Sequence, residues 1–308
     1  MSERASCMQW RYLPQTPHFL TALIPEKRMI RRIVPPKKEI EGCQLIFKNI
    51  SENIFVIIGH PAYANVTALV LPKGVVMVDC GIQLPAVVET KREIEEISKV
   101  KVNTVILTHF HSDHTRALPA FSDCRIIASN LLARNLKRAG RKPPKGFEPT
   151  FPNETFHDQL EIREGDIRLI IKRTGGHTDG STYAYCPNYN VVVAGDNLWI
   201  DYYPWGGAKN GDPDLWIQAL QEYLSLDAEH FIPGHGPVGR KDNVTELLDY
   251  IKKVRKVMKE MIALGKTEEE ILAAGEEVEY YTSGNAKPST LKRWCKVWRK
   301  QSSGETSE

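Results

Sequence analysis

The stretch His109-Phe110-His111-Ser112-Asp113-His114 decides how the rest of this sequence is interpreted. It follows the apolar, β-branched run Val102–Leu107, which predicts a buried strand. Three of the nine histidines of the chain fall within these six residues. Imidazole nitrogen and carboxylate oxygen are ligands that a borderline divalent ion such as Zn²⁺ takes. The stretch therefore predicts a metal site at the end of a strand, whereas the alternative is polar residues that share one exposed loop.

Other histidine and aspartate residues adjoin glycines at the ends of predicted strands, namely His177, Asp196 and His235. Taken singly, each of them is better interpreted as an ordinary turn residue than as a ligand. Together with the first stretch they provide five histidines and two aspartates at strand ends, which suits two metal ions that share one bridging carboxylate. The neighbouring glycines lack a Cβ atom, so the backbone can come close to the ions there.

Short apolar runs separated by turns predict the elements around these motifs. Strands are predicted over residues 45–49, 54–58, 67–71, 75–78, 102–107, 125–128, 160–163, 167–172, 182–185, 191–194 and 230–232. Helices are predicted over residues 86–98, 130–138, 214–225, 243–263, 267–273 and 289–300, with Thr267 as an N-cap. Residues 139–153, rich in proline, predict a loop that is either a lid or a long connection. Two blocks of strands interrupted by helices predict two packed sheets with helices outside.

Composition places the chain among globular proteins of ordinary charge. The chain has 308 residues, 42% hydrophobic residues and a net charge of +3, too small to indicate a nucleic-acid or membrane partner. Residues 1–10 are polar and lack the apolar stretch of a secretory signal, so we expect a cytoplasmic protein. The six cysteines are scattered and form no C-x-x-C pair, which favours buried, reduced thiols over a disulfide framework.

The motifs together resemble those of metallo-β-lactamase-fold hydrolases, and most closely the glyoxalase II and lactonase-like branch. The resemblance spans about residues 45–238 and implies a fold of the α/β (α+β) class. This fold is a four-layer αββα sandwich of two mixed β-sheets flanked by helices, with a helical C-terminal extension. The implied organisation is a basic N-terminal extension over residues 1–42, a catalytic domain over 43–240, and a helical extension over 241–308 packed on the same domain.

The resemblance also implies seven metal ligands, which bind a first ion (His109, His111, His177), a second ion (Asp113, His114, His235) or both (Asp196). It implies that Asp79 supports the site from behind. We expect two divalent ions per chain, zinc first, with iron and manganese as alternatives. Aspartate rather than cysteine at the bridging position argues against the secreted β-lactamase subclasses that use a thiolate. Thr115-Arg116 stands where the family usually has a small pair such as Gly-Gly, which puts substrate contacts near this turn in doubt.

Two such ions can hold a shared hydroxide that attacks a carbonyl or phosphoryl centre. Asp113 is the expected catalytic residue, because it both ligates and orients the nucleophile. The sequence thus predicts a dinuclear metal-dependent hydrolase of ester-type bonds, whether thioester, lactone or carboxylic ester. The alternatives are a phosphodiester or phosphotriester hydrolase on the same centre and an iron-dependent persulfide dioxygenase-like oxidoreductase. The expected partner is a small-molecule substrate; a homodimer is left open, and neither membrane nor nucleic acid is expected.

Four residues are candidates for substrate contacts, with a plain surface turn or core packing as the alternatives: His60, Tyr202, Tyr203 and Trp205. His157 and His230 have no ligand-like context and are interpreted as structural. The predicted helix over residues 289–300 carries tryptophans on one face and basic residues around the rest. It either docks by its tryptophans as a terminal helix or recruits an anionic carrier, as the carboxy-terminal helices of glyoxalase II relatives do.

Overall fold

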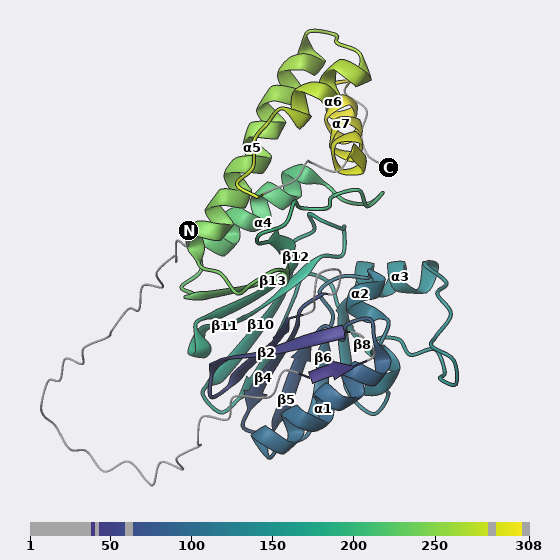
Figure 1. The fold of residues 1–308 in the computed structure, drawn as a ribbon, viewed down its shortest axis with the longest axis vertical. Helices are drawn as coiled ribbons and strands as arrows, with labels where there is room; N and C mark the ends of the chain where they lie inside the picture. Colours follow the sequence, from purple (N-terminus) through teal and green to yellow (C-terminus); the bar gives the residue numbers. More distant parts are fainter. Residues whose placement is uncertain (1–37, 41–42, 59–63, 283–287, 304–308) are drawn as a thin grey trace, which may run out of the picture. The chain divides into compact units, whose positions relative to one another are not determined.

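The computed structural model describes residues 38–40, 43–58, 64–282 and 288–303, which contain two β-sheets and their flanking helices (Figure 1). The eight-stranded sheet has the order β1-β2-β3-β4-β5-β6-β7-β8. Its strands are β1 (Lys38–Ile40), β2 (Cys43–Ser51), β3 (Ile54–Ile58), β4 (Val66–Leu71), β5 (Gly74–Val78), β6 (Val102–Ile106), β7 (Arg125–Ser129) and β8 (Glu154–Phe156). The five-stranded sheet has the order β13-β12-β11-β10-β9. Its strands are β9 (Gln159–Glu164), β10 (Ile167–Arg173), β11 (Thr182–Cys186), β12 (Val191–Trp199) and β13 (His230–His235).

The helices agree with those that the sequence predicts to within about three residues at each end. They are α1 (Leu84–Ser98), α2 (Ser112–Thr115), α3 (Asn130–Arg138), α4 (Pro213–Ser225), α5 (Lys241–Ala263), α6 (Glu268–Glu276) and α7 (Pro288–Ser302), with the short 3₁₀ turns η1 (Leu118–Phe121) and η2 (Pro187–Tyr189). The exception is α2, which the sequence analysis treats as an irregular turn. Its single helical turn is too short to show a hydrophobic period. Thr267 caps α6 as predicted, because its side chain accepts a hydrogen bond from the amide of Glu270.

Both sheets are mixed, and their inner faces meet in one apolar layer. In the first sheet β1–β5 pair antiparallel and β5–β8 pair parallel, and in the second only β12 and β13 are parallel. Alternate residues of a strand point to opposite faces. Val76 and Val78 of β5 accordingly pack between the sheets against residues such as Leu169 and Val193. Every residue of β5 is buried, which explains why its sequence is a continuous apolar run.

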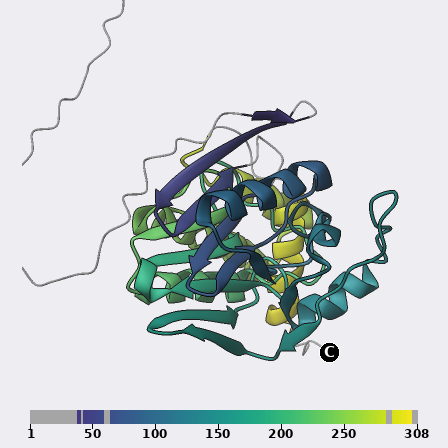
Figure 2. The same cartoon turned by 90° about the horizontal axis from the view of Figure 1, so that it is seen from below.

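Helices cover the two outer faces. Val87 and Ile94 of α1 pack with Leu132 of α3 on the first sheet. On the second sheet, α4, α5 and α7 form a single core that includes the fully buried Trp216 and Trp298. Figures 1 and 2 show α1 (blue) on one side of the sandwich and the C-terminal helices (green to yellow) on the other. The predicted four-layer αββα class is therefore confirmed.

Two strands of the first sheet have no counterpart in the sequence analysis. β1 lies within the stretch 1–42 and pairs antiparallel with β2, whereas the rest of that stretch lies outside the described residues. β8 follows the proline-rich loop and pairs parallel with β7. Each has only three residues, so neither shows a period, and each depends on its neighbour in the sheet.

Four cysteines, Cys80, Cys124, Cys186 and Cys295, are buried free thiols. Cys7 and the side chain of Cys43 lie outside the described residues. Among the residues that the structure describes, no helix has both the length and the apolar character needed to span a bilayer.

Candidate metal centre

Parallel strands bring the first part of the site to one edge of the sheet. Val78, the last residue of β5, is opposite Ile106, the last residue of β6. Asp79 follows the first strand, and Thr108 and His109 follow the second. Asp79 has φ 62°, a left-handed conformation that turns its side chain back toward β6, where its Oδ1 accepts a hydrogen bond of 2.8 Å from the amide of Thr108.

The short helix α2 places two consecutive side chains toward different partners. Asp113 Oδ2 lies 3.2 Å from His235 Nε2, and His114 Nε2 lies 3.0 Å from Asp196 Oδ1. Consecutive side chains point in different directions on a helix, so a single turn can place Asp113 toward His235 and His114 toward Asp196. The hydroxyl of Thr115 closes the turn by donating a 2.8 Å hydrogen bond to the carbonyl of His111.

The prediction that both Asp196 and His235 lie at strand ends is confirmed for His235 and wrong for Asp196. β12 continues past Ala194 to Trp199, and β13 ends at His235 itself. Asp196 therefore lies inside a strand, at a point where the register with β13 shifts on both sides of Gly195. The parallel partner β13 extends the strand beyond the apolar run, and this pairing is not visible in the local sequence.

All seven predicted ligands come together in two groups, and within each group the ligand atoms lie within 4.8 Å of one another. The groups are His109, His111, His177 and Asp196, and Asp113, His114 and His235. Asp196 faces both. Its Oδ2 lies 3.4 Å from His177 Nε2 and 3.6 Å from His109 Nε2. Its Oδ1 lies 3.0 Å from His114 Nε2 and 3.5 Å from His235 Nε2.

Hydrogen bonding and spacing both fit divalent ions. His109 Nε2, His114 Nε2 and Asp196 Oδ1 are buried and have no hydrogen-bond partner, although the last two atoms are only 3.0 Å apart. Buried polar atoms of this kind are costly unless something else satisfies them. Zn²⁺ with tetrahedral bonds of about 2.0–2.1 Å would hold its ligand atoms roughly 3.3 Å apart. The separations between Asp196 and the four imidazole nitrogens span 3.0–3.6 Å, so the donor set fits such ions.

A second layer of hydrogen bonds fixes the orientation of the imidazoles. His114 Nδ1 donates to Asp79 Oδ2 at 2.7 Å, and His177 Nδ1 donates to the carbonyl of Trp205 at 2.8 Å. His109 Nδ1 lies 3.1 Å from the hydroxyl of Thr108, which in turn donates to Asp79 Oδ2. Each bond occupies Nδ1 and leaves the Nε2 lone pair directed toward the other ligands.

Charge and burial divide the histidines into two kinds. Burial lowers the pKa of His109, of His111 to about 3 and of His177 to about 4, so these rings are neutral. Burial also opposes the charged forms of His114 and His235, but Asp196 outweighs it together with Asp79 beside His114 and Asp113 beside His235. The pKa of His114 is therefore raised, and that of His235 is raised to about 9. The Asp196 carboxylate thus favours positive charge beside it, which a bound cation would supply in place of the protons on His114 and His235.

The candidates for substrate contact differ in where the structure places them relative to the cluster. Trp205 lies at the cluster, with its ring 5.1 Å from that of His111 and 5.6 Å from that of His177. Tyr203 instead packs against Tyr250 and Tyr280 in the helical core. Tyr202 is exposed, and no described contact ties it to the cluster. His60 lies outside the described residues.

The two histidines interpreted as structural stay away from the cluster. The side chain of His157 is exposed and pairs with Asp158, and that of His230 is partly buried beside Glu229. Other described residues touch the ligands and were not predicted, among them Thr108, Asn197 and Trp199. Asn197 Oδ1 accepts a 2.9 Å hydrogen bond from the amide of His177. The ring of Trp199 stacks on His235 at 4.2 Å. Their only sequence signal is that each lies within three residues of a ligand.

The family model described as the metallo-beta-lactamase superfamily matches residues 60–235. The chain belongs to the metallo-beta-lactamase superfamily. The matched stretch holds all seven clustered residues, so the centre described above lies in the part of the chain that the family model matches. The predicted family is thereby confirmed, whereas its glyoxalase II and lactonase-like branch stays a prediction.

Two relatives illustrate how far this metallo-beta-lactamase superfamily chain has diverged. It is 23% identical to a linear primary-alkylsulfatase of a Pseudomonas species, over 58% of this chain but only 42% of that protein. It is 25% identical to a type 2 metallo-beta-lactamase of a Bacillus species, over 63% of this chain and 75% of the relative. A solved metallo-beta-lactamase from Pontibacter korlensis superposes with a TM-score of 0.60 at 20% identity, covering 68% of this chain and 99% of that one. The solved structure shares the fold.

Proposed function

We propose that this protein is a dinuclear metal-dependent hydrolase that cleaves an ester-type bond, a thioester, lactone or carboxylic ester, with two zinc ions. The proposal rests on the position of the Asp196 carboxylate between two groups of imidazoles. Its Oδ2 faces His109 and His177, while its Oδ1 faces His114 and His235. One carboxylate turned toward two groups of imidazoles is the arrangement that suits a pair of ions. When bound, such a pair supplies an activated water and positive charge for a developing oxyanion.

Residues around the cluster are suited to the other requirements of hydrolysis, which are to orient the attacking water and to exclude other water. The side chain of Asp113 is 24% exposed, whereas that of Asp196 is 3% exposed. Asp113 is therefore the carboxylate of the cluster that a water molecule from solvent can reach. Its Oδ2 faces His114 and His235, which leaves Oδ1 to accept a hydrogen bond from the attacking water and orient it. Trp205 and Trp199 pack against His177 and His235 and shield the imidazoles from water.

No serine or cysteine nucleophile is needed for this reaction. Among the described residues, the cysteines are buried, and burial raises the pKa of Cys80, which adjoins Asp79. Cys80 is held as a neutral thiol that donates to the carbonyl of His114. It is therefore a poor nucleophile, and the chemistry is assigned to the His and Asp cluster.

The experiment pairs elemental analysis of the purified protein with a substrate panel. The panel contains carboxylic esters, thioesters, lactones and phosphodiesters, together with an alkyl sulfate because of the alkylsulfatase relative. We expect about two zinc ions per chain and turnover of one ester class. Asp196→Ala should lose metal and hydrolysis while keeping the fold, and Asp249→Ala, which removes an exposed acid of α5, should keep both.

Two results would overturn the proposal. An Asp196→Ala protein that retains both metal ions and activity would remove the bridging role. About one iron per chain with no hydrolysis of any panel member would mean that the cluster serves an oxidative reaction. Turnover of the phosphodiester alone would replace the ester-type substrate while leaving the dinuclear centre in place.

A further inference from the structure

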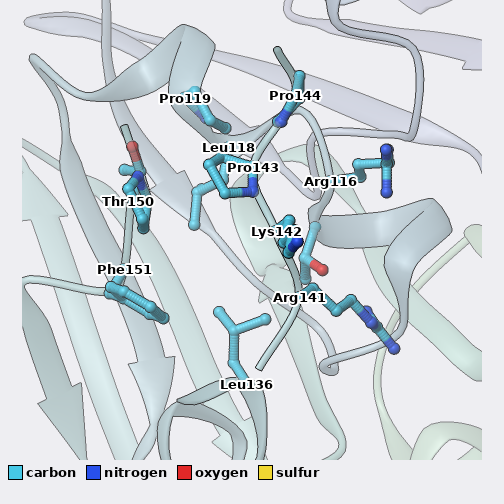
Figure 3. Close-up of a pocket in the computed structure, with 12 residues that line it drawn as sticks. Arg116, Leu118, Pro119, Leu136, Arg141, Lys142, Pro143, Pro144, Thr150 and Phe151 are labelled. Atoms are coloured by element: carbon cyan, nitrogen blue, oxygen red, sulfur yellow. The ribbon is translucent and has the colours of Figure 1, made fainter. Parts of the chain in front are cut away.

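A pocket beside the metal centre is formed by the end of α2, by η1, by α3 and by the loop that follows α3 (Figure 3). The cavity itself is small, about 50 Å³, and opens to solvent at its mouth. Its apolar lining includes Leu118, Leu136 and Phe151 with prolines of the loop, and its polar lining includes Arg116, Arg141 and Lys142. None of these lining residues is a predicted metal ligand, and none has a role in the proposed reaction.

Arg141 is held against the loop that carries the metal ligands. Its Nη1 donates a 2.8 Å hydrogen bond to the carbonyl of Phe110, which lies between His109 and His111. Its guanidinium carbon lies 5.9 Å from the centre of the Phe110 ring. This contact uses one of the five N–H groups of the arginine, so most of the donor fork remains available.

Arg116 caps the C-terminal end of α2, three residues after Asp113. It is exposed, and no carboxylate within the described ranges pairs with it. Burial lowers the pKa of Arg141, the carboxylate of Asp113 opposes this effect, and the positive charge of Arg116 lowers the pKa further. Arg116 and Arg141 line the same pocket, so an anion bound there would be attracted by both positive charges.

The surrounding charge has the same sign. The loop over residues 139–153 contains Arg141, Lys142 and Lys145 but only one acid, Glu148. In Figure 3 the side chains of Arg116 and Arg141 extend to one side of the pocket, while Leu118, Leu136 and Phe151 form the apolar part on the other. Phe151 is 40% exposed, so the apolar part is open to a ligand. A basic rim with an apolar wall suits an amphiphilic anion.

We propose that Arg116 and Arg141 bind an oxyanion group of the substrate, a carboxylate or a phosphate, and that Leu118, Leu136 and Phe151 bind an alkyl chain attached beside it. Because Arg141 lies against Phe110, the anion lies close to the scissile bond and the chain extends away from the metal centre. The inference rests on the proposed hydrolysis and names its substrate class, an ester with a neighbouring anion and an apolar tail.

The first test is equilibrium binding of octanoate and of octyl phosphate to the full-length, metal-loaded protein by calorimetry. Arginine makes bidentate hydrogen bonds to either oxyanion, and charge-assisted bonds are about twice as strong as neutral ones. We expect Arg116→Gln and Arg141→Gln each to raise the dissociation constant about tenfold at equal metal content. Lys145→Gln, which removes one positive charge from the same loop outside the pocket lining, should change it less than twofold. The probe that binds more tightly identifies the oxyanion.

The second test measures hydrolysis of 2-acetoxyoctanoate, of 2-octyl acetate without the carboxylate, and of 2-acetoxypropanoate without the chain. We expect kcat/KM to be highest for the first, and Arg116→Gln to reduce its advantage over 2-octyl acetate about tenfold, mainly through KM. Probe binding that is the same in both arginine variants as in the wild type would overturn the subsite. Arginine-dependent probe binding without hydrolysis of any ester would support the subsite and reject the hydrolase.

Discussion

At the scale of single residues, the centre depends on how closely the backbone of β13 approaches the carboxylate of Asp196. Gly234 lies beside Asp196, and a Cβ atom on it would lie 1.9 Å from Asp196 Oδ1 and 2.9 Å from the amide nitrogen of Asp196. Neither atom can move freely, because the amide belongs to β12 and the carboxylate faces four imidazoles. Glycine at 234 therefore sets the position of the bridging oxygen.

Gly234→Ala should displace the Asp196 carboxylate and reduce bound metal from about two ions per chain to one or none. Hydrolysis should fall about 10- to 100-fold, as it does when the support of a metal ligand is lost. Elemental analysis and the rate on the best panel substrate provide the measurement. Gly165→Ala is the control, because a Cβ there meets nothing within 4 Å although φ is +61°. A Gly234→Ala protein with full metal content would contradict the role assigned to this contact.

Asp79→Asn should weaken metal binding about 10- to 100-fold while leaving the backbone intact. The carboxylate accepts hydrogen bonds from His114 Nδ1 at 2.7 Å and from the hydroxyl of Thr108 at 2.7 Å. An amide offers one oxygen in place of two and no negative charge. Asparagine tolerates the left-handed φ of 62° at this position, so strain is avoided. Competition with a chromophoric chelator measures the change, and an unaltered affinity would mean that Asp79 serves the fold alone.

The seven clustered residues could be predicted from the sequence because each belongs to a short local motif next to a strand. Thr108, Asn197 and Trp199 could not be predicted in the same way. Their hydrogen bonds and ring contacts join segments that are far apart in the chain, as in the bond between His177 and Asn197. Nor could the sequence show that Tyr203 packs into the helical core while Trp205 lies on His111.

At the scale of elements, long amphipathic helices and apolar strands were predictable, whereas elements set by a neighbour were not. α5 spans 23 residues and buries one face, so its period is plain. β12 runs past its apolar stretch because β13 pairs with it, and β8 exists only as a partner of β7. The chemistry depends on the less predictable elements, because Asp196 lies in β12 and Asp113 lies in α2.

α7 contributes stability to the same core that supports the site. Trp298 is fully buried, and Trp294 contacts Trp216, whose ring lies 5.6 Å from that of His177. Trp298→Ala should lower the free energy of unfolding by about 3–5 kcal/mol, the usual cost of removing a buried aromatic ring. Leu264→Ala, at a position that is 72% exposed, should change it by less than about 0.5 kcal/mol. Denaturant titration measures both, and equal effects would contradict the burial of α7.

At the scale of the whole described sandwich, the metal centre joins the two sheets. His109, Asp113 and His114 follow β6 of the first sheet, while Asp196 and His235 belong to β12 and β13 of the second. The sheets otherwise meet through a layer of apolar side chains, including Val78 and Val193, that provides no directional bonds. Ions shared by ligands from both sheets would therefore cross-link the sheets. The unfolded chain cannot bind the ions in the same way.

Removing the metal should consequently lower the midpoint temperature of unfolding by about 10 °C. An ion present at 100 times its dissociation constant stabilises a protein by about 2.7 kcal/mol, so two ions contribute about 5 kcal/mol. In a chain of this size 1 kcal/mol corresponds to about 2 °C. Calorimetry before and after chelation, then after zinc is restored, gives the shift and its reversal. Asp196→Ala is the control: if its shift on chelation matched that of the wild type, the stabilisation would come from ions bound elsewhere. An unchanged midpoint in fully stripped wild-type protein would mean that the sheets hold the ligands in place without the ions.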